Sequence, residues 1–311
     1  MIRKVGTKVG AIDLGSNSLR LLVALVHEKG LQPLRGELRE TRLGEKLHWG
    51  GHLNPPARVR TLEALSALLE IMAEEQVESG IVVATSAVRE AVDGALFLQE
   101  MEKISLYPVR LLSEREEAYY GFRGAVENIV GASSAGDLLV LDLGGRSSEF
   151  AWQERETFHY HSFSFGAVSL NEAFFPPDSR QTAKEYQDLQ MHVRQALHLE
   201  KSLTVAAESR GLVGLGGTVT TLGALAQELH SFESGCVHGC RLLREEVDVI
   251  TQKLRCRSPA QRALLLPFAP QRADIITAGA AALSALLECL GKESLYVSEQ
   301  GLLHGVLREL C

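Results

Sequence analysis

The sequence has few features of a secreted, membrane-spanning or nucleic-acid-binding protein. Its 311 residues include only five cysteines, an odd number without the spacing of a disulfide framework, which favours a reducing compartment. The first residues, MIRKVGTKVG, lack the apolar core of a signal peptide. The most apolar helical stretch, residues 275–290, is short for a membrane span and contains Glu288. We therefore expect a cytoplasmic protein without a membrane partner.

An excess of positive charge is also absent. The formal net charge is −7, which argues against a general nucleic-acid binder. A polyanionic ligand is still compatible with this charge if arginines gather at one site and a cation assists. The group His230, Cys236, His238 and Cys240 does not have the spacing of a standard structural zinc site.

The segment LLVLDLGGRSSEF, residues 138–150, combines a buried strand, a glycine turn and a second strand. Gly144 and Gly145 lack Cβ atoms, so the backbone N–H groups of the turn can approach a phosphate. Asp142 and Glu149 would then put carboxylates beside an anion, which is favourable only if a metal ion lies between them. From this segment alone, a plain β-hairpin with exposed acids is an equally good interpretation.

The same pattern occurs twice. VGAIDLGSNSLRLLV, residues 9–23, aligns with LLVLDLGGRSSEFAW, residues 138–152, and Asp13, Leu14, Gly15 and Ser18 are repeated as Asp142, Leu143, Gly144 and Ser147. Two such hairpins indicate duplicated domains. We expect an α/β protein with domains at 1–130 and 131–311 that face a cleft, with 131–137 as linker and the last helix able to pack back on the first domain. Helices are predicted near 56–77, 94–104, 114–128 and 180–202.

A third glycine turn lies in GLVGLGGTVTTLGAL, residues 211–225. Gly216, Gly217 and Thr218 follow an apolar strand and begin a helix, so unpaired backbone N–H groups and a helix N-terminus coincide, which favours an anion site. Thr218 could either cap the helix or bind a phosphate oxygen. Tight packing between strand and helix would also select these glycines.

Two adjacent acids begin the helix of LLSEREEAYYGF, residues 111–122. Ser113 and Glu116 have the spacing of a capping box, which gives Glu116 a structural role. Glu117 is not needed for the cap and is either a solvated first-turn acid or a general base. In ATSAVREA, residues 84–91, Arg89 follows a strand and is a candidate phosphate ligand, or an exposed helix residue.

Taken together, these segments resemble the exopolyphosphatase/guanosine pentaphosphate phosphohydrolase family of the actin-like ATPase superfamily. The matching segments run in family order along nearly the whole chain: IDLGSNSLRLLV, LGEKL, ATSAVREA, SEREEA, LDLGGRSSEF, FSFGAVSLNE, GLGGTVTTLGAL, VHG, QRADIITAGAAAL and VSEQGLLHGVL. The resemblance implies two ribonuclease-H-like domains facing a central cleft and hydrolysis of a terminal phosphoanhydride with Mg²⁺. It also suggests a homodimer.

The resemblance implies roles for individual residues. Glu117 matches the catalytic glutamate, and Asp142 and Glu149 match acids that position metal and water. The positions that match or lie near phosphate-binding positions of the family are Ser16, Asn17, Ser18, Arg20, Arg89, Gly144, Gly145, Arg146, Ser147, Gly216, Gly217 and Thr218.

One position departs from the family, because Arg146 replaces the third glycine of the hairpin turn. A left-handed backbone there would be strained by about 1 kcal/mol or more. We expect the Arg146 guanidinium to contact a phosphate, and the alternatives are a side chain that blocks the site and one that faces solvent. The leading hypothesis is an exopolyphosphatase that acts on inorganic polyphosphate. The alternatives are guanosine pentaphosphate, using the same residues, and a non-catalytic phosphate or nucleotide sensor.

Overall fold

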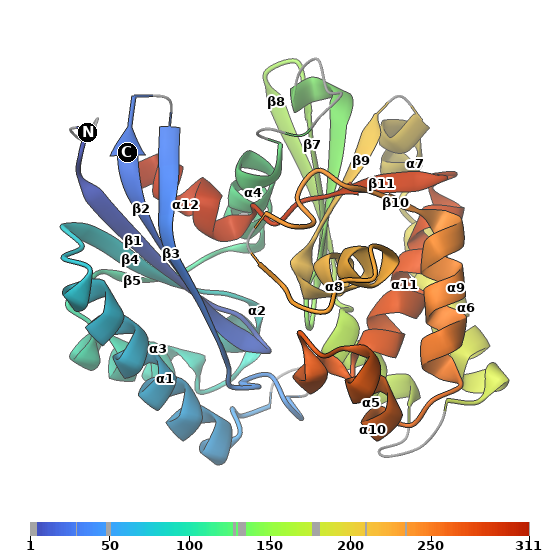
Figure 1. The fold of residues 1–311 in the computed structure, drawn as a ribbon, viewed down its shortest axis with the longest axis horizontal. Helices are drawn as coiled ribbons and strands as arrows, with labels where there is room; N and C mark the ends of the chain where they lie inside the picture. The colour runs from blue at the N-terminus through green and yellow to red at the C-terminus, as the bar shows by residue number, and fades with distance from the viewer. Residues whose placement is uncertain are drawn as a thin grey trace. The chain divides into compact units, whose positions relative to one another are not determined.

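The computed structural model describes residues 5–28, 30–47, 51–126, 129, 135–175, 181–208, 210–233 and 235–310. The chain forms two compact units. Unit 1 comprises residues 1–124 and 301–311, and unit 2 comprises residues 125–300. Each unit contains one mixed β-sheet with helices packed on it (Figure 1). The α/β class expected from the sequence is confirmed, and the last eleven residues lie in unit 1.

The sheet of unit 1 has the order β3-β2-β1-β4-β5. Its strands are β1 (Lys8–Leu14), β2 (Ser18–His27), β3 (Gly30–Glu40), β4 (Ser79–Ala84) and β5 (Val109–Leu111). The first three strands are antiparallel neighbours, whereas β4 and β5 run parallel to β1. The long edge strand β3 was not predicted.

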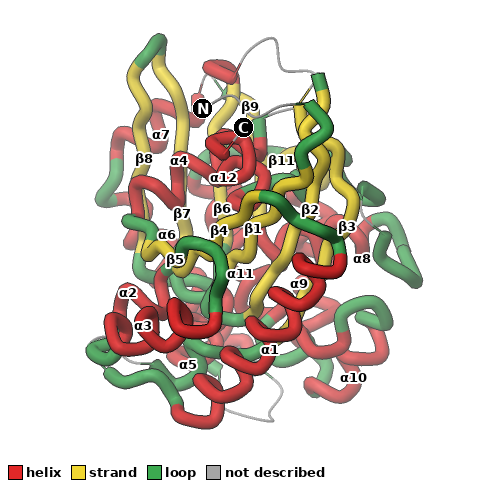
Figure 2. Tube along the Cα trace, turned by 90° about the vertical axis from the view of Figure 1, so that its left-hand side faces the viewer, coloured by secondary structure: helices red, strands yellow, loops and turns green. Residues whose placement is uncertain are grey.

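Alternating side chains of this sheet belong to two cores. Ile12 and Leu14 pack with α1 (Pro55–Glu74) and α3 (Gly94–Ile104). Val9 and Ala11 pack with α4 (Glu114–Ala125) and α12 (Leu302–Leu310). Period-two alternation in β1 therefore places the two helix pairs on opposite faces, as Figures 1 and 2 show. The short helix α2 (Ser86–Glu90) follows β4.

The sheet of unit 2 has the order β10-β11-β9-β6-β7-β8. Its strands are β6 (Leu138–Leu143), β7 (Ser148–Glu154), β8 (Thr157–Phe163), β9 (Gly211–Leu215), β10 (Arg241–Leu243) and β11 (Ser294–Val297). The strands β6, β7 and β8 are antiparallel neighbours, and β9 runs parallel to β6. This order repeats that of unit 1, so the duplication inferred from the two hairpins is present in the fold.

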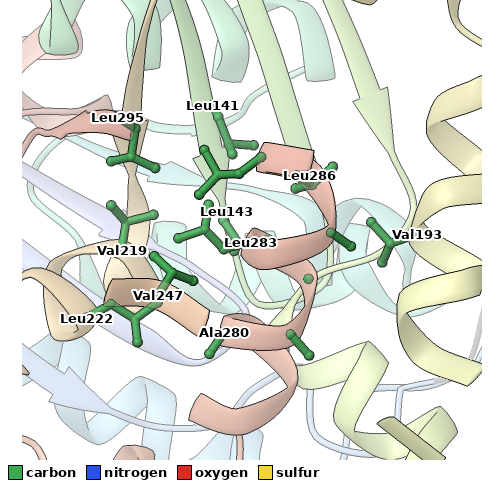
Figure 3. Packing of buried hydrophobic residues seen from close by; sticks show 14 of the residues in the cluster. Leu141, Leu143, Val193, Val219, Leu222, Val247, Ala280, Leu283, Leu286 and Leu295 are labelled. Atoms are coloured by element: carbon green, nitrogen blue, oxygen red, sulfur yellow. The ribbon is translucent and has the colours of Figure 1, made fainter. Parts of the chain in front are cut away.

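The helices of unit 2 surround a core in which α11 is central. They are α5 (Ala167–Phe174), α6 (Ala183–His198), α7 (Lys201–Glu208), α8 (Gly216–Ala226), α9 (Arg244–Arg255), α10 (Pro259–Leu265) and α11 (Ile276–Cys289). From Ile276 to Leu287 every side chain of α11 is buried. Figure 3 shows Ala280 and Leu283 of this helix with Leu143, Val219 and Leu222 in the same cluster. Burial on all sides explains why α11 is apolar throughout.

Two further sequence predictions need adjustment. The helix predicted near 180–202 is divided into α6 and α7, and residues 176–180 lie outside the described residues. In the predicted linker, residues 131–134 also lie outside them, and Ala135–Asp137 form a 3-10 turn. Within the described part of the chain, no helix is long and apolar enough to span a bilayer.

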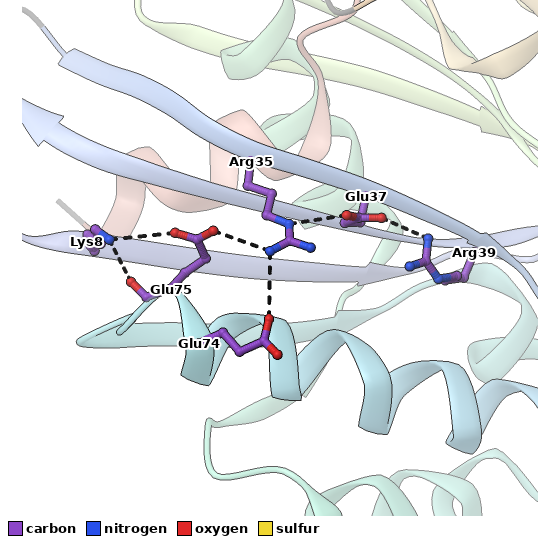
Figure 4. A network of polar contacts seen from close by, with 6 residues as sticks. All are labelled: Lys8, Arg35, Glu37, Arg39, Glu74 and Glu75. Carbon is purple, nitrogen blue, oxygen red and sulfur yellow. Dashed lines mark hydrogen bonds and ion pairs between the residues drawn. The ribbon is translucent and has the colours of Figure 1, made fainter.

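A charged network covers the outer strand of unit 1. The Arg35 guanidinium contacts Glu37 at 3.2 Å and Glu75 at 3.4 Å, and Glu75 also contacts Lys8 at 3.7 Å (Figure 4). Exposed pairs of this kind add little stability individually. Charged side chains do, however, make an edge strand a poor template for pairing with another chain.

The helix that carries Glu117 is held by an unusually close contact with α12. A Cβ atom on Gly305 would overlap the carbonyl group of Tyr120, and one on Gly124 would overlap the carbonyl group of Gly301. Glycines therefore allow the backbones of α4 and α12 to touch. This contact fixes the position of α4 within unit 1.

We predict that Gly305→Ala lowers the free energy of unfolding by about 1 kcal/mol or more, because the added methyl group meets backbone atoms that must shift. In an uncrowded helix the same change would instead stabilise by about 1 kcal/mol. Urea denaturation measures the difference. Gly36→Ala in β3 is the control, since its Cβ would lie 3.9 Å from the nearest atom. A stabilised Gly305→Ala variant would contradict the packing argument.

Candidate active site

The turn between β6 and β7 brings two carboxylates together. The Gly144 N–H donates to the Ser147 carbonyl oxygen at 3.1 Å, which closes the turn, and Asp142 lies directly opposite Glu149 in the register. Cross-strand partners point to the same face of a sheet. Glu149 is buried and accepts a hydrogen bond from the Ser162 hydroxyl at 3.3 Å. Paired carboxylate oxygens fit Mg²⁺, which binds hard oxygen ligands and offsets their repulsion.

The glycine turn that begins α8 lies beside this pair. β9 is parallel to β6, with Leu215 next to Asp142 in the register. Gly216 has a φ of 90°, and a Cβ atom there would lie 3.1 Å from Asp142 Oδ1 and overlap the Leu143 carbonyl oxygen. Only glycine satisfies both requirements. The N-terminus of α8, with N–H groups that have no acceptor within the helix, therefore adjoins Asp142.

Thr218 does not cap α8. The N-cap residue is Leu215, and α8 has no side-chain cap. The Thr218 side chain is buried against Gly279 of α11, and a Cβ atom added to Gly279 would overlap the Thr218 hydroxyl oxygen. The capping role considered for Thr218 is therefore wrong. Because the Thr218 hydroxyl is buried against α11, the backbone N–H of Thr218 is the better candidate to donate to a phosphate.

Arg272 also belongs to this region, although sequence reasoning did not single it out. A Cβ atom on Gly217 would overlap the Arg272 guanidinium, so this cation lies directly over the start of α8. Arg272 ends the 3-10 turn Pro270–Arg272 that precedes α11. The segment QRADIITAGAAAL contained the residue, but no spacing rule connects it with a glycine turn more than fifty residues earlier. A guanidinium and a helix N-terminus together favour phosphate binding.

Arg146 is buried, with 8% of its surface exposed, so the solvent-facing alternative is wrong. Its Nη1 lies 3.3 Å from Glu172 Oε2 of α5. Arg146 is not among the described non-glycine residues with positive φ, so the arginine causes none of the backbone strain considered for a left-handed conformation. A phosphate contact by Arg146 stays a prediction.

The first hairpin of unit 1 has the same turn. The Gly15 N–H donates to the Ser18 carbonyl oxygen at 3.1 Å, as Gly144 does to Ser147. The hydroxyls of Ser16 and Ser86 share a buried hydrogen bond of 2.9 Å. The Asn17 carbonyl oxygen accepts from the N–H groups of residues 41 and 42, so this turn also anchors the segment after β3.

Arg20 lies in register opposite Asp13. Their neighbours on the same face, Ala11 and Leu22, pack with Tyr120 of α4. Because side chains of a strand alternate between its two faces, Asp13 and Arg20 lie on the face of the sheet that α4 covers. This is the helix that carries Glu117.

Arg89 and Glu117 are in direct contact. Arg89 Nη1 donates to Glu117 Oε2 at 3.0 Å and to the Leu112 carbonyl oxygen at 2.9 Å. Both side chains are mostly buried, with 21% and 14% exposed. An arginine has five N–H donors, so those of Nη2 and Nε are not needed for these bonds and can bind a phosphate. The geometry adds a positioning role to the predicted phosphate-binding role.

Glu116 forms the predicted capping box. The Ser113 N–H donates to Glu116 Oε2 at 2.9 Å, and the Glu116 N–H donates to the Ser113 hydroxyl at 3.3 Å. The backbone bond from Ser113, its hydroxyl bond and then the nearby Arg110 lower the pKa of Glu116 below its usual value. The two adjacent glutamates therefore have different surroundings, with Glu116 in the cap and Glu117 on Arg89.

A sequence model described as the Ppx/GppA phosphatase family matches residues 22–311. The chain belongs to the Ppx/GppA phosphatase family. It is 36% identical to exopolyphosphatase 2 of Mycobacterium tuberculosis in an alignment that covers 98% of this chain and 99% of that protein.

Solved structures agree with this family and its actin-like fold. A Ppx/GppA protein of Aquifex aeolicus superposes with a TM-score of 0.79 at 28% identity, covering 98% of this chain and 97% of that chain. An exopolyphosphatase-like protein superposes with a TM-score of 0.87 at 27% identity, covering 98% and 100%. As a Ppx/GppA protein, the chain is a phosphoanhydride hydrolase.

The Ppx/GppA site residues predicted from the sequence fall into two sets. Unit 1 contains Ser16, Asn17, Ser18, Arg20, Arg89 and Glu117. Unit 2 contains Asp142, Gly144, Gly145, Arg146, Ser147, Glu149, Gly216, Gly217 and Thr218. Among the described residues, no group of three or more histidine, cysteine or acidic side chains could hold a metal ion by itself, so a cation at Asp142 and Glu149 would need substrate or water oxygens as further ligands.

We predict that Arg89→Lys lowers kcat by about 10- to 100-fold, the range that misplacement of a reacting group can cost. Lysine keeps a positive charge for phosphate but cannot reproduce the guanidinium bridge between Glu117 and the Leu112 carbonyl group. KM should change much less than kcat in steady-state phosphate-release assays. The control is Arg110→Lys, because Arg110 of β5 pairs with Glu116, the neighbour of Glu117 on α4. A raised KM with an unchanged kcat would mean that Arg89 only binds substrate.

Proposed function

We propose that this protein is an exopolyphosphatase that hydrolyses the terminal phosphoanhydride of inorganic polyphosphate and releases orthophosphate. The observation that carries the proposal is the adjacency of the Asp142–Glu149 pair to the glycine turn at Gly216, because carboxylates suited to a cation lie beside N–H groups suited to an anion. The similarity to a named exopolyphosphatase over 99% of that protein supports the choice of polyphosphate.

The residues of unit 2 have the chemistry to bind a phosphate chain. The N–H groups at the start of α8 and the Arg272 guanidinium over Gly217 would hold phosphate oxygens. Asp142 and Glu149 would hold Mg²⁺. When bound, Mg²⁺ offsets the negative charge of the reacting phosphates, which is the main requirement of phosphoryl transfer.

Glu117 is proposed to take the proton from the attacking water. A general base must be ionised and held in place, and Arg89 provides both an opposite charge and a fixed orientation at 3.0 Å. Glu116 is engaged in the cap and is not proposed to react.

We predict that Glu117→Gln reduces phosphate release from polyphosphate by about 10²- to 10⁴-fold, the usual cost of losing a general base. Substrate binding should persist, because glutamine keeps the shape of the side chain. The matched control is Glu116→Gln on the same helical turn, which should affect stability more than turnover. The assay follows orthophosphate release with Mg²⁺ from polyphosphate and, in parallel, from guanosine pentaphosphate.

Near-normal turnover by Glu117→Gln would reject Glu117 as the base. A wild-type protein that releases phosphate efficiently from guanosine pentaphosphate but not from polyphosphate would reject the proposed substrate. If the wild-type protein releases phosphate from neither compound, both polyphosphate and guanosine pentaphosphate are rejected as substrates.

A further inference from the structure

An arginine with no exposed surface lies between the helices of unit 2. Arg262 of α10 is 0% exposed. Burial lowers the pKa of Arg262 to about 10, and the charge of Asp274 opposes this change, so the guanidinium is still charged at neutral pH. Replacing a buried charge by a well-packed apolar side chain of similar volume is often neutral or stabilising. Stability alone therefore does not explain why this position carries an arginine.

The Arg262 guanidinium binds three segments that are separated in the chain. Its Nε donates to the Leu254 carbonyl oxygen of α9 at 3.0 Å, and its Nη1 donates to the Ala273 carbonyl oxygen at 3.1 Å. Its Nη2 donates to the amide oxygen of Gln181, which directly precedes the N-cap of α6. The planar fork of a guanidinium allows one side chain to fix three acceptors at once.

The Ala273 carbonyl group adjoins the turn that carries Arg272. This is a single 3-10 turn that ends at Arg272, and the Ala273 N–H donates to the Pro270 carbonyl oxygen at 3.2 Å. Hydrogen bonds in such short turns have poorer geometry than those of an α-helix. Arg262 adds an anchor from the core at the residue after Arg272, whose guanidinium lies over Gly217 at the start of α8.

We propose that Arg262 is a positioning residue for phosphate binding, because it fixes the backbone from which the Arg272 guanidinium reaches the start of α8. The inference rests on the proposed phosphate site at α8. A guanidinium binds phosphate through directed hydrogen bonds, so a shift of this backbone weakens them without changing any group that touches the ligand. The effect of Arg262 on ligand binding must then depend on Arg272, which a purely structural role does not require.

The test is a double-variant cycle on the affinity for imidodiphosphate, a phosphoanhydride analogue that is not hydrolysed, measured by calorimetry with Mg²⁺. Lysine keeps the charge of Arg262 but cannot bind the three acceptors together. Arg262→Lys should weaken binding by about 10-fold, within the range for residues coupled through a backbone shift. In an Arg272→Gln background the same change should have an effect of about 2-fold or less, because the group that Arg262 positions is gone.

Arg210→Lys is the matched control. Arg210 also donates to two carbonyl oxygens of unit 2, those of Gly136 at 3.1 Å and Ala206 at 3.2 Å. It directly precedes β9, whose other end leads into α8, so this variant should bind imidodiphosphate as the wild type does. Thermal unfolding shows whether each variant is folded. If Arg262→Lys does not fold, Arg262→Met, which removes the buried charge, takes its place in the cycle.

Each result decides the inference. Wild-type affinity in the folded Arg262 variant, or equal weakening with and without Arg272→Gln, would overturn it and leave the phosphate site intact. Unchanged affinity in Arg272→Gln would show that Arg272 does not bind the phosphate, which also rejects a positioning role for Arg262. No binding of imidodiphosphate by the wild type would reject the phosphate site itself and this inference with it.

Discussion

The parallel pairing of β6 with β9 places Asp142 beside Leu215, one residue before the turn that begins α8. Parallel strands end at the same edge of a sheet, so the carboxylate of one strand meets the helix N-terminus that follows the other. Gly216 makes this approach possible, because any side chain there would overlap the Leu143 carbonyl oxygen. This contact brings the start of α8, with the Arg272 guanidinium over Gly217, beside Asp142, which the β6–β7 register pairs with Glu149. Opposite charges at such short range suit a ligand that itself combines phosphate with a divalent cation.

In unit 1 the comparable constraint is the backbone contact between α4 and α12. Glycines at 124 and 305 let the two backbones touch, and α4 carries Glu116 and Glu117 at its N-terminus. The cap formed by Ser113 and Glu116 fixes where the helix begins. Neighbouring acids of the same type therefore differ in their contacts, because Glu116 completes the helix cap and Glu117 is bound by Arg89.

Local sequence signals predicted those parts of the protein that depend on local physics. The repeated Asp-Leu-Gly hairpins predicted duplicated sheets, because turn geometry and strand alternation are local properties. The capping box of Glu116 was readable from four residues. By contrast, β3 contains Pro33 and mixes charged with apolar residues, so the alternation of apolar and polar side chains that identifies a strand is weak. This segment forms a strand because it pairs with β2. The contact between Arg272 and Gly217 could not be predicted from the sequence, because no local pattern joins residues so far apart in the chain. The burial of Arg146 could not be predicted either, because it depends on α5, which reaches the turn only in the folded chain.

We propose that the end of β6 and the start of α8 form a joint cation and phosphate site. A crystal structure with Mn²⁺ and imidodiphosphate, a non-hydrolysable phosphoanhydride analogue, tests it most directly through the anomalous signal of manganese. The expected result is a manganese peak within coordination distance of Asp142 and Glu149 carboxylate oxygens, and a phosphate on the N–H groups of Gly217 and Thr218. An analogue bound elsewhere, or bound at α8 with manganese away from both carboxylates, would contradict it.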